Sequence, residues 1–417
     1  MVLFLLQSYH LFGVDFLKNY IIIPENTTGR GGSFLYYQTK INWLIDDGWQ
    51  VYVLAHDEGK MYFTFQNCEY IPVAELNINP FILSTKQREK ILSRIDIATY
   101  FNNQEVIVES SSFDFAIWGD VLAKRYGGRN LIFVVGEELK RINPSMKHYL
   151  RYKLDNNELA FIKSMYVQRL FPDVSSVEAT SHQLVAWMDN NPDADFLYTP
   201  LPDEDFNIGF ISRLNKSFVQ KALADIKKFA EKHTDTTFSL TVIGDATDSV
   251  SMNDCKKILD GSKNLKVVFT GWFDTIPMNL LQSFDVTVGK AGCASLVYRN
   301  NMRAITYAMD EDICMGVLGY DLNENILASE GKHYEIEDVL YRLVYTDEYS
   351  LDKMKKCTDE TGYCDFTKHL EYINSHQVGY YNVKKVRPSF VSISKSLWVL
   401  LFNNCNYIRI LKLFKIR

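Results

Sequence analysis

The stretch Ser283–Tyr307 reads SFDVTVGKAGCASLVYRNNMRAITY. The apolar run Phe284–Val288 predicts a short strand, and Gly289–Gly292, which carries a lysine, predicts a tight loop. Cys293–Arg299 is typical of the start of a helix, and Arg303–Tyr307 is typical of a second strand. A strand, a loop, a helix and a strand in this order form one βαβ unit of a parallel sheet. The stretch therefore predicts an α/β fold.

The start of the predicted helix is a candidate phosphate site. The backbone N–H groups of Cys293, Ala294 and Ser295 have no acceptor within a helix that begins there. They would lie just beyond the carboxyl end of a strand, where open α/β sheets bind phosphate groups. An ordinary crossover between two strands explains the same pattern and is the alternative.

The same stretch resembles the donor-nucleotide region of glycosyltransferases of the GT-B fold. The likeness is greatest to the pattern S-R-x-G-A-x-T-x-x-E of the lipid-linked N-acetylglucosaminyltransferases of peptidoglycan assembly. Lys290, Gly292 and Ser295 match this pattern in kind, and Tyr298 stands where the family has the glutamate that holds the ribose hydroxyls. The resemblance implies an α/β fold with two Rossmann-like domains that face each other across a cleft. It also implies a nucleotide-sugar donor and no cofactor.

Length and charge agree with two domains and one localised acidic partner. A chain of 417 residues exceeds the usual size of a single core, and its hydrophobic content of 47% supports substantial cores. The net charge is −6, but eight basic and no acidic residues follow Glu371, so residues 1–371 carry −14. An acidic body with a basic tail argues against general nucleic-acid binding.

Cysteine usage and the N-terminus predict a cytoplasmic protein. The seven cysteines are odd in number, and even the nearest pair, Cys357 and Cys364, is too widely spaced for a zinc knuckle. The lack of a disulfide framework is typical of a reducing compartment. The run VLFLLQ near the N-terminus has no basic region before it and predicts no signal peptide. No run approaches the ~20 apolar residues of a spanning helix.

Two series of strands and helices flank one linker, Asp189–Asp205, which is rich in Pro, Asn and Asp. The predicted domains are residues 1–200, residues 201–375, and a basic, aromatic-rich tail of residues 376–417. Before the linker we predict strands at Tyr20–Ile23, Gln50–Ala55, Tyr70–Val73, Glu105–Val108, Leu131–Val135 and Ser176–Thr180, and helices at Phe34–Ile45, within Phe81–Tyr100, up to Tyr126, at Tyr149–Met165 and at Ser181–Met188. After it we predict strands at Ile208–Ile211, Phe238–Ile243 and Val267–Phe269, and helices at Val219–Lys232 and Met252–Asp260.

Glycines and cations follow the first strand of each predicted domain. Gly31 and Gly32 match the Gly-Gly pair that faces the cleft in many GT-B enzymes. Gly209–Lys216 (GFISRLNK) resembles the segment G-R-L-x-x-x-K, which places an arginine and a lysine on the donor diphosphate. Arg213 matches directly, and Lys216 stands closer to the arginine than in the pattern. Cations there stabilise the charge that collects on a departing nucleoside diphosphate. The alternative is a solvated loop at the strand end.

Two further strand ends and a carboxylate complete the candidate site. Gly244 would let the backbone approach a base, and Trp272 or Phe273 could stack on a uracil. A general base should lie at the carboxyl end of a first-domain strand. We favour Glu137, because Gly136 lets the chain turn there. The other carboxylates in such positions are Glu109, Asp114 and Glu138.

Two other motifs carry less weight. Asp193-Ala194-Asp195 spells the D-x-D by which transferases of another fold hold Mn²⁺ or Mg²⁺, but its place in the linker indicates a coincidental match, and we predict no metal. Ser392–Phe414 mixes apolar, aromatic and basic residues. This pattern is typical of a helix on an anionic bilayer and equally of a terminal helix that packs on the first domain.

These features predict a metal-independent cytoplasmic glycosyltransferase, with peripheral contact to the inner face of the cell membrane as one of the two roles open for its tail. It would extend a lipid-linked or cell-surface glycan acceptor, such as a capsule polysaccharide, from a nucleotide-sugar donor, with a UDP-sugar favoured. Two alternatives stay open. One is a non-catalytic GT-B partner subunit, which Tyr298 favours. The other is a sugar-nucleotide epimerase of the same fold, against which the lack of histidines at the strand ends counts.

Overall fold

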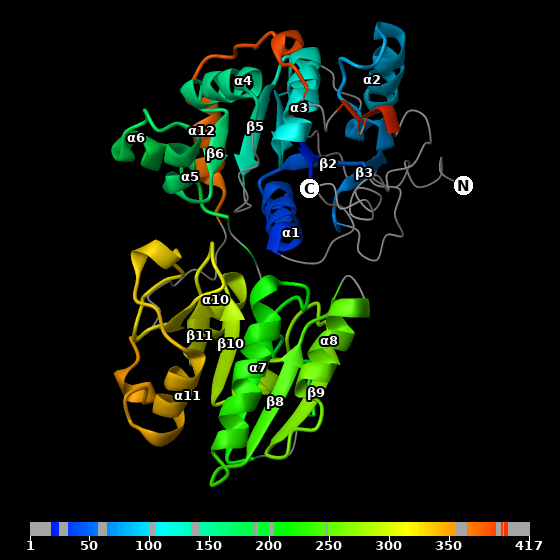
Figure 1. Cartoon of the computed structure of the whole chain (residues 1–417). Coiled ribbons are helices and arrows are strands. Elements are labelled where there is room, and N and C mark those ends of the chain that lie inside the picture. Colours follow the sequence, from blue (N-terminus) through cyan, green and yellow to red (C-terminus); the bar gives the residue numbers. More distant parts are fainter. Residues whose placement is uncertain are drawn as a thin grey trace, which may run out of the picture. The chain divides into compact units, whose positions relative to one another are not determined.

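The computed structural model describes residues 18–24, 32–56, 65–99, 105–134, 142–186, 188, 191–199, 204–246, 249–355, 365–388, 393–394 and 396–398. The chain divides into two compact units (Figure 1). The first comprises residues 1–189 and 363–417, and the second comprises residues 190–362. Residues 363–375, which we predicted to end the second domain, cluster with the first unit. Within the described residues each unit contains a six-stranded sheet.

The first unit is a parallel sheet with the strand order β3-β2-β1-β4-β5-β6. Its strands are β1 (Lys18–Ile23), β2 (Trp49–Ala55), β3 (Glu69–Pro72), β4 (Glu105–Ser110), β5 (Arg129–Val134) and β6 (Leu159–Phe161). Its helices are α1 (Gly32–Asp46), α2 (Thr85–Thr99), α3 (Phe113–Tyr126), α4 (Pro144–Asp155), α5 (Ser164–Leu170), α6 (Ser176–Ser181) and α12 (Thr367–Asn374).

The central strands of this sheet are buried on both faces. Along β1, Ile21 and Ile23 belong to one apolar cluster, and Tyr20 and Ile22 belong to another. Successive side chains of a strand point to opposite faces, so apolar side chains pack against both sides of the sheet. This is why these strands appear in the sequence as continuous apolar runs and not as alternating ones.

The second unit has the strand order β12-β11-β10-β7-β8-β9 and is parallel except for β12. Its strands are β7 (Phe206–Ile211), β8 (Phe238–Ile243), β9 (Leu265–Gly271), β10 (Val286–Lys290), β11 (Ala304–Tyr307) and β12 (Cys314–Val317). Its helices are α7 (Ser217–Lys232), α8 (Ser249–Leu259), α9 (Met278–Gln282), α10 (Gly292–Arg299) and α11 (Ile336–Tyr345). The βαβ unit predicted from Ser283–Tyr307 is confirmed as β10, α10 and β11, with Val288 opposite Ile305.

Three predicted elements of the first unit are wrong. Ser176–Thr180, predicted as a strand, lies in α6, because the Ser175 side chain accepts the Glu178 N–H and caps a helix there. The predicted helix Ser181–Met188 is also wrong, because the described residues 182–186 that follow α6 form no helix. Its Leu184 N–H donates to the Phe161 carbonyl oxygen of β6 at 2.9 Å.

The predicted helix Tyr149–Met165 is three elements, α4, β6 and α5. The helix α4 ends at Asp155, and Asn157 then adopts a φ of 53°. Asparagine tolerates this left-handed conformation better than most residues, so the pair Asn156-Asn157 reverses the chain. Apolar residues at helical spacing lie on both sides of this turn, and that spacing led us to predict one continuous helix.

The helix α12 belongs to the first unit, which the chain rejoins after residue 362, and it packs beside β6 (Figure 1). The Tyr372 hydroxyl donates to the Leu159 carbonyl oxygen of β6 at 2.5 Å. His369 Nδ1 lies 3.2 Å from Lys40 Nζ of α1. Most of the predicted membrane tail, including all of residues 399–417, lies outside the described residues. In the part of the chain that is described, no helix combines the length and apolarity needed to cross a bilayer.

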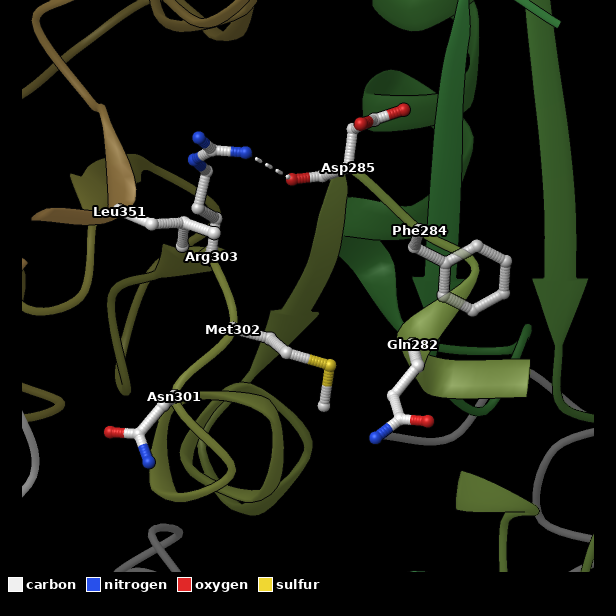
Figure 2. Close-up of a pocket in the computed structure, with 7 residues that line it drawn as sticks. All are labelled: Gln282, Phe284, Asp285, Asn301, Met302, Arg303 and Leu351. Atoms are coloured by element: carbon white, nitrogen blue, oxygen red, sulfur yellow. Dashed lines mark hydrogen bonds between the residues drawn. The ribbon is translucent and has the colours of Figure 1, made fainter. Parts of the chain in front are cut away.

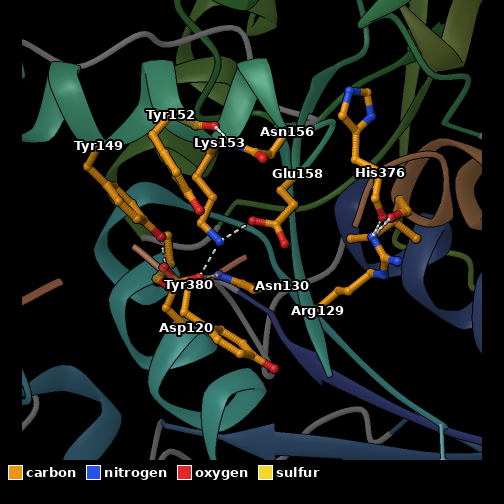
Figure 3. A network of polar contacts seen from close by, with 12 residues as sticks. Asp120, Arg129, Asn130, Tyr149, Tyr152, Lys153, Asn156, Glu158, His376 and Tyr380 are labelled. Carbon is orange, nitrogen blue, oxygen red and sulfur yellow. Dashed lines mark hydrogen bonds and ion pairs between the residues drawn. The ribbon is translucent and has the colours of Figure 1, made fainter. Parts of the chain in front are cut away.

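A buried ionic network holds α3, α4 and the start of β6 together (Figure 3). Lys153 Nζ lies 2.5 Å from Asp120 Oδ1 and 2.5 Å from Glu158 Oε2, and all three side chains are nearly inaccessible. Asn130 Nδ2 also donates to Asp120 Oδ1, at 2.8 Å. Burial alone would lower the pKa of Lys153, but the two carboxylates outweigh it and raise that pKa.

Candidate functional site

The strand order of the second unit reverses between β7 and β10. From β7 the chain continues to β8 and β9 on one side, and then crosses to β10 and β11 on the other. The strands β7 and β10 are neighbours, with Ile211 opposite Gly289. The segments that follow them therefore diverge from the same carboxyl edge. Doubly wound α/β sheets bind their ligands at such a reversal.

Arg213 and Lys216 lie on the loop after β7, and both are exposed. The loop is tied to the sheet, because the Leu214 N–H donates to the Asp245 carbonyl oxygen after β8 at 3.0 Å. Both cations act on Cys293 at the start of α10. Burial raises the pKa of the Cys293 thiol to about 11, and the charges of Arg213 and Lys216 oppose this rise. The end of β7, which leads into this loop, also lies close to the start of α10, because a Cβ on Gly289 would lie 3.4 Å from the Ile211 carbonyl oxygen and 3.2 Å from the Ala294 nitrogen. The loop with the two predicted cations therefore begins near the start of α10.

Gly244 lies against the backbone of this loop. Its φ is 146°, and a Cβ at this position would lie 1.9 Å from the Ser212 carbonyl oxygen. Its N–H donates to the Gly271 carbonyl oxygen at 2.8 Å. Only glycine combines this positive φ with so close an approach to the Ser212 carbonyl oxygen. Gly244 thus lets the loop that carries Arg213 lie close to the end of β8, a role that its position after a strand did not predict.

The loop between β10 and α10 has an unusual backbone. Ala291 has a φ of 51° and a ψ of −122°, a combination typical of glycine in a tight turn. The Ser295 N–H donates to the Ala291 carbonyl oxygen at 3.0 Å. The N–H groups that precede it in α10 have no acceptor within the helix. Gly292, the first residue of α10, is exposed.

Lys290 ends β10 and contacts the acidic loop after β11. Its Nζ donates to the Glu311 carbonyl oxygen at 3.1 Å and lies 3.7 Å from Asp312 Oδ1. The ammonium also lies 5.8 Å from the centre of the Phe218 ring. A phosphate oxygen that binds Lys290 must therefore compete with Asp312.

Asn325 connects the start of α10 with the end of β11, and no sequence pattern pointed to it. Thr306 Oγ1 donates to Asn325 Oδ1 at 2.7 Å. Asn325 Nδ2 donates to Ser295 Oγ at 2.6 Å and to the Ala291 carbonyl oxygen at 3.2 Å. Ser295, a predicted donor-binding residue, thus accepts a hydrogen bond from Asn325 and keeps its own proton to donate.

The residues predicted to contact the nucleoside make contacts within the second unit. Tyr298 is 7% exposed, and its hydroxyl donates to the Lys355 carbonyl oxygen at 2.9 Å. Trp272 follows β9 directly and is half-buried. Its indole N–H donates to Asp274 Oδ1 at 3.1 Å. The hydroxyl of Tyr298 is therefore engaged by the protein itself.

Three of the site residues predicted in the first unit lie outside the residues that the structure describes. Glu137, Glu138 and Gly31 are not among the described residues. Gly32 begins α1, where an added Cβ would lie 3.4 Å from Met188 Cε.

Glu109 is fully buried, unlike a base that must reach a ligand. Its Oε2 lies 2.5 Å from Lys40 Nζ and accepts the Tyr20 hydroxyl at 2.6 Å, and its Oε1 accepts the Tyr36 hydroxyl at 2.9 Å. Burial and the nearby carboxylate raise the pKa values of both tyrosines. Asp114 is exposed in the first turn of α3. Glu109 therefore ties β1, β4 and α1 together.

The D-x-D triplet forms a local turn. Asp193 Oδ1 accepts the N–H groups of Asp195 and Phe196 at 2.8 and 3.0 Å. The backbone of Asp193 pairs with Ile276 and Met278. These contacts give the triplet a structural role. Among the described residues, no three His, Cys, Asp or Glu side chains gather as a metal site.

A pocket of about 260 Å³ lies at the opposite edge of the second sheet, near the start of β11 (Figure 2). Arg303 donates there to the Tyr349 carbonyl oxygen at 2.7 Å and to the Asp285 carbonyl oxygen at 3.3 Å. None of the described candidate donor residues lines it. The lining residues are Gln282, Phe284, Asp285, Asn301, Met302, Arg303 and Leu351.

Two such sheets in one chain define the GT-B fold of glycosyltransferases, and solved structures agree. The chain is 14% identical to a glycosyltransferase from Rickettsia africae, with a TM-score of 0.55 over 94% of this chain and 100% of that one. It is 9% identical to Anabaena HepE in complex with UDP-glucose, with a TM-score of 0.50 over 92% of this chain and 98% of that one. Comparisons with protein-family models and with curated protein sequences find no match.

Proposed function

We propose that this chain is a glycosyltransferase that transfers a sugar from a nucleoside-diphosphate donor, with a UDP-sugar favoured, to a lipid-linked or cell-surface glycan. The proximity of Arg213 and Lys216 to the start of α10, at the strand reversal of the second sheet, carries this proposal. Two cations and a helix N-terminus at one strand edge suit a diphosphate. The UDP-glucose bound by HepE, which shares the fold, supports the choice of uridine.

The proposed chemistry is stabilisation of the leaving group. As the sugar–phosphate bond breaks, negative charge collects on the diphosphate, and fixed cations lower the energy of that state. Arg213 can bind two phosphate oxygens through its planar guanidinium. Lys216 adds a second charge, and Lys290 adds a third when it exchanges Asp312 for phosphate. These cations supply the positive charge without a metal ion.

Neutral groups complete the proposed donor site. The N–H groups of Gly292 and its neighbours, with the Ser295 hydroxyl, would donate to phosphate oxygens. Trp272 would stack on the base, and Tyr298 and Gly244 would shape the nucleoside side of the site.

The residues that would bind the acceptor and the cellular location are proposed from the sequence alone, as part of the same proposal. The first unit would present the acceptor, with Glu137 as general base and the Gly31-Gly32 pair near the reacting groups. The basic residues of 376–417 would hold a cytoplasmic protein at the anionic inner face of the cell membrane. A role in polysaccharide or capsule synthesis fits these features.

One observation favours a second candidate, a non-catalytic GT-B partner subunit. The Tyr298 hydroxyl stands where relatives have the ribose-binding glutamate, and it is bonded to the Lys355 carbonyl oxygen. A chain without a ribose anchor could keep the fold and support an active subunit.

Calorimetric titration of UDP, GDP and CMP separates these candidates. We expect saturable binding of UDP, with the same affinity in EDTA as in Mg²⁺. Arg213→Ala should weaken this binding, and Lys221→Ala on the exposed face of α7 is the matched control. If none of the three nucleotides binds to folded wild-type protein, the enzyme proposal fails and the partner subunit is favoured.

A further inference from the structure

We propose that Asn325 is a positioning residue, which holds the turn Ala291–Ser295 in the conformation that binds the donor diphosphate. This inference rests on the proposed function and names the side chain that shapes its phosphate site. Asn325 touches the turn through a single amide group, which donates to both Ser295 and Ala291.

The turn needs such support because its backbone is strained. Ala291 has positive φ, which costs free energy for any residue with a Cβ. Strain of this kind persists only where the surroundings hold it. Here the carbonyl group of the strained residue is held by two donors, the Ser295 N–H and Asn325 Nδ2.

The orientation of the Asn325 amide follows from its partners. A carbonyl oxygen can only accept, so the NH₂ group must face Ala291. The oxygen Oδ1 then faces Thr306, whose hydroxyl donates to it. The segment that carries Asn325 is tied to the chain just after β11, because the Met309 N–H donates to the Ile326 carbonyl oxygen at 3.0 Å.

This arrangement acts on the proposed phosphate contacts in two ways. The peptide bond between Ala291 and Gly292 is planar, so fixing the carbonyl group of Ala291 also fixes the direction of the Gly292 N–H. The Ser295 hydroxyl accepts from Asn325, so its own proton is directed toward another acceptor. Both donors lie in the first turn of α10, whose start is close to the end of β7 and so to the loop that carries Arg213 and Lys216.

The test is a double-mutant cycle on UDP affinity, measured by calorimetry with the full chain. We expect Asn325→Ala to weaken UDP binding about tenfold, the effect of losing one or two hydrogen bonds. Ala291→Gly removes the strain, so in that background Asn325→Ala should weaken binding by less than about threefold. Asn323→Ala, two residues away on the exposed loop, is the matched control and should leave affinity unchanged. Thermal unfolding shows that each variant is folded.

The outcomes separate this inference from the proposed function. If the wild type binds UDP and Asn325→Ala binds equally well, or loses the same factor in both backgrounds, the positioning role is overturned and the proposed function stands. If the wild type does not bind UDP, both are overturned. If Asn325→Ala does not fold, Thr306→Val carries the test, since it removes only the donor that orients the amide. Unchanged affinity in folded Thr306→Val then overturns the positioning role.

Discussion

The carbonyl oxygen of Ser212 lies 1.9 Å from the place that a Cβ of residue 244 would occupy. The loop that carries Arg213 is thus pressed against the backbone after β8, in a contact that only glycine at 244 permits. This contact sets the position of the proposed diphosphate-binding arginine.

Gly244→Ala should displace that loop. We expect it to lower the free energy of unfolding by about 2–4 kcal/mol and to weaken UDP binding, because the backbone of Ser212 cannot move without moving Arg213. Gly271→Ala is the matched control. Gly271 also has positive φ, but an added Cβ there meets nothing within 4 Å, so it should cost only about 1 kcal/mol. Equal losses in denaturant unfolding of the two variants would show that the close approach has no effect.

Arg213→Ala should reduce turnover more than donor affinity. The guanidinium contact strengthens as charge collects on the leaving diphosphate, so its loss should appear mainly in kcat. Removal of one charge-stabilising donor costs on the order of 100-fold in such sites. Arg213→Lys should recover part of the loss, because lysine lacks the planar fork. The measurement is transfer from a labelled UDP-sugar to membrane acceptors. Wild-type turnover in folded Arg213→Ala protein would remove Arg213 from the site.

Tyr298→Phe distinguishes a structural from a nucleotide-binding hydroxyl. The hydroxyl donates to the Lys355 carbonyl oxygen, so its loss should lower the free energy of unfolding by about 1 kcal/mol. We expect the Kd of UDP to change by less than about twofold. A larger loss of affinity at unchanged stability would mean that the hydroxyl serves the ribose.

Lys153→Met should destabilise the first unit strongly. It leaves Asp120 and Glu158 buried without a cation, which costs about 3–5 kcal/mol. The triple variant Asp120→Asn, Lys153→Met, Glu158→Gln should recover most of this loss, since no buried charge is then left. Arg151→Met on the same helix breaks two solvent-accessible ion pairs, to Asp155 and Asp173, and should cost about 1 kcal/mol. Urea unfolding measures all three, and a Lys153→Met variant no weaker than Arg151→Met would refute the network.

The stability of the first unit should fall as the pH drops below 6.5. Burial, together with the charge of Lys40, holds the pKa of His369 well below its ordinary value of 6.5, and burial also lowers the pKa of His182. Below pH 6.5 the unfolded chain binds protons that the folded chain does not, so stability present above this pH is lost, by at most about 1.4 kcal/mol per pH unit for each histidine.

The measurement is the midpoint temperature of the unfolding transition of the first unit, at pH values between 7.5 and 5. His369→Gln should flatten the dependence, because the residue no longer titrates. His148→Gln, which replaces an exposed histidine of α4, is the control for the loss of one histidine. The same slope in the wild type and in His369→Gln would show that His369 does not contribute.

The sequence alone determined the α/β class, the βαβ unit around Lys290 and the cations after β7. Each of these depends on residues that are close in the chain. An apolar run followed by glycine and a helix start is encoded locally, and the position of Arg213 after a strand places it at the carboxyl edge of any parallel sheet. The sequence failed where a short local signal was ambiguous, as at α6, where a serine cap outweighed a run that we read as a strand.

Only the tertiary structure decided the contacts between distant residues. Asn325 meets Ala291 and Ser295 because the chain after β11 folds back along α10, and no local period records that return. His369 reaches Lys40 because the chain rejoins the first unit after residue 362, where α12 packs within that unit. Hydrogen bonds and ion pairs of this kind depend on where whole helices and strands lie. Those positions are decided together, when the helices and strands bury their apolar faces against one another. That is why the sequence could name the cations of the proposed site but not the amide that we propose holds its backbone.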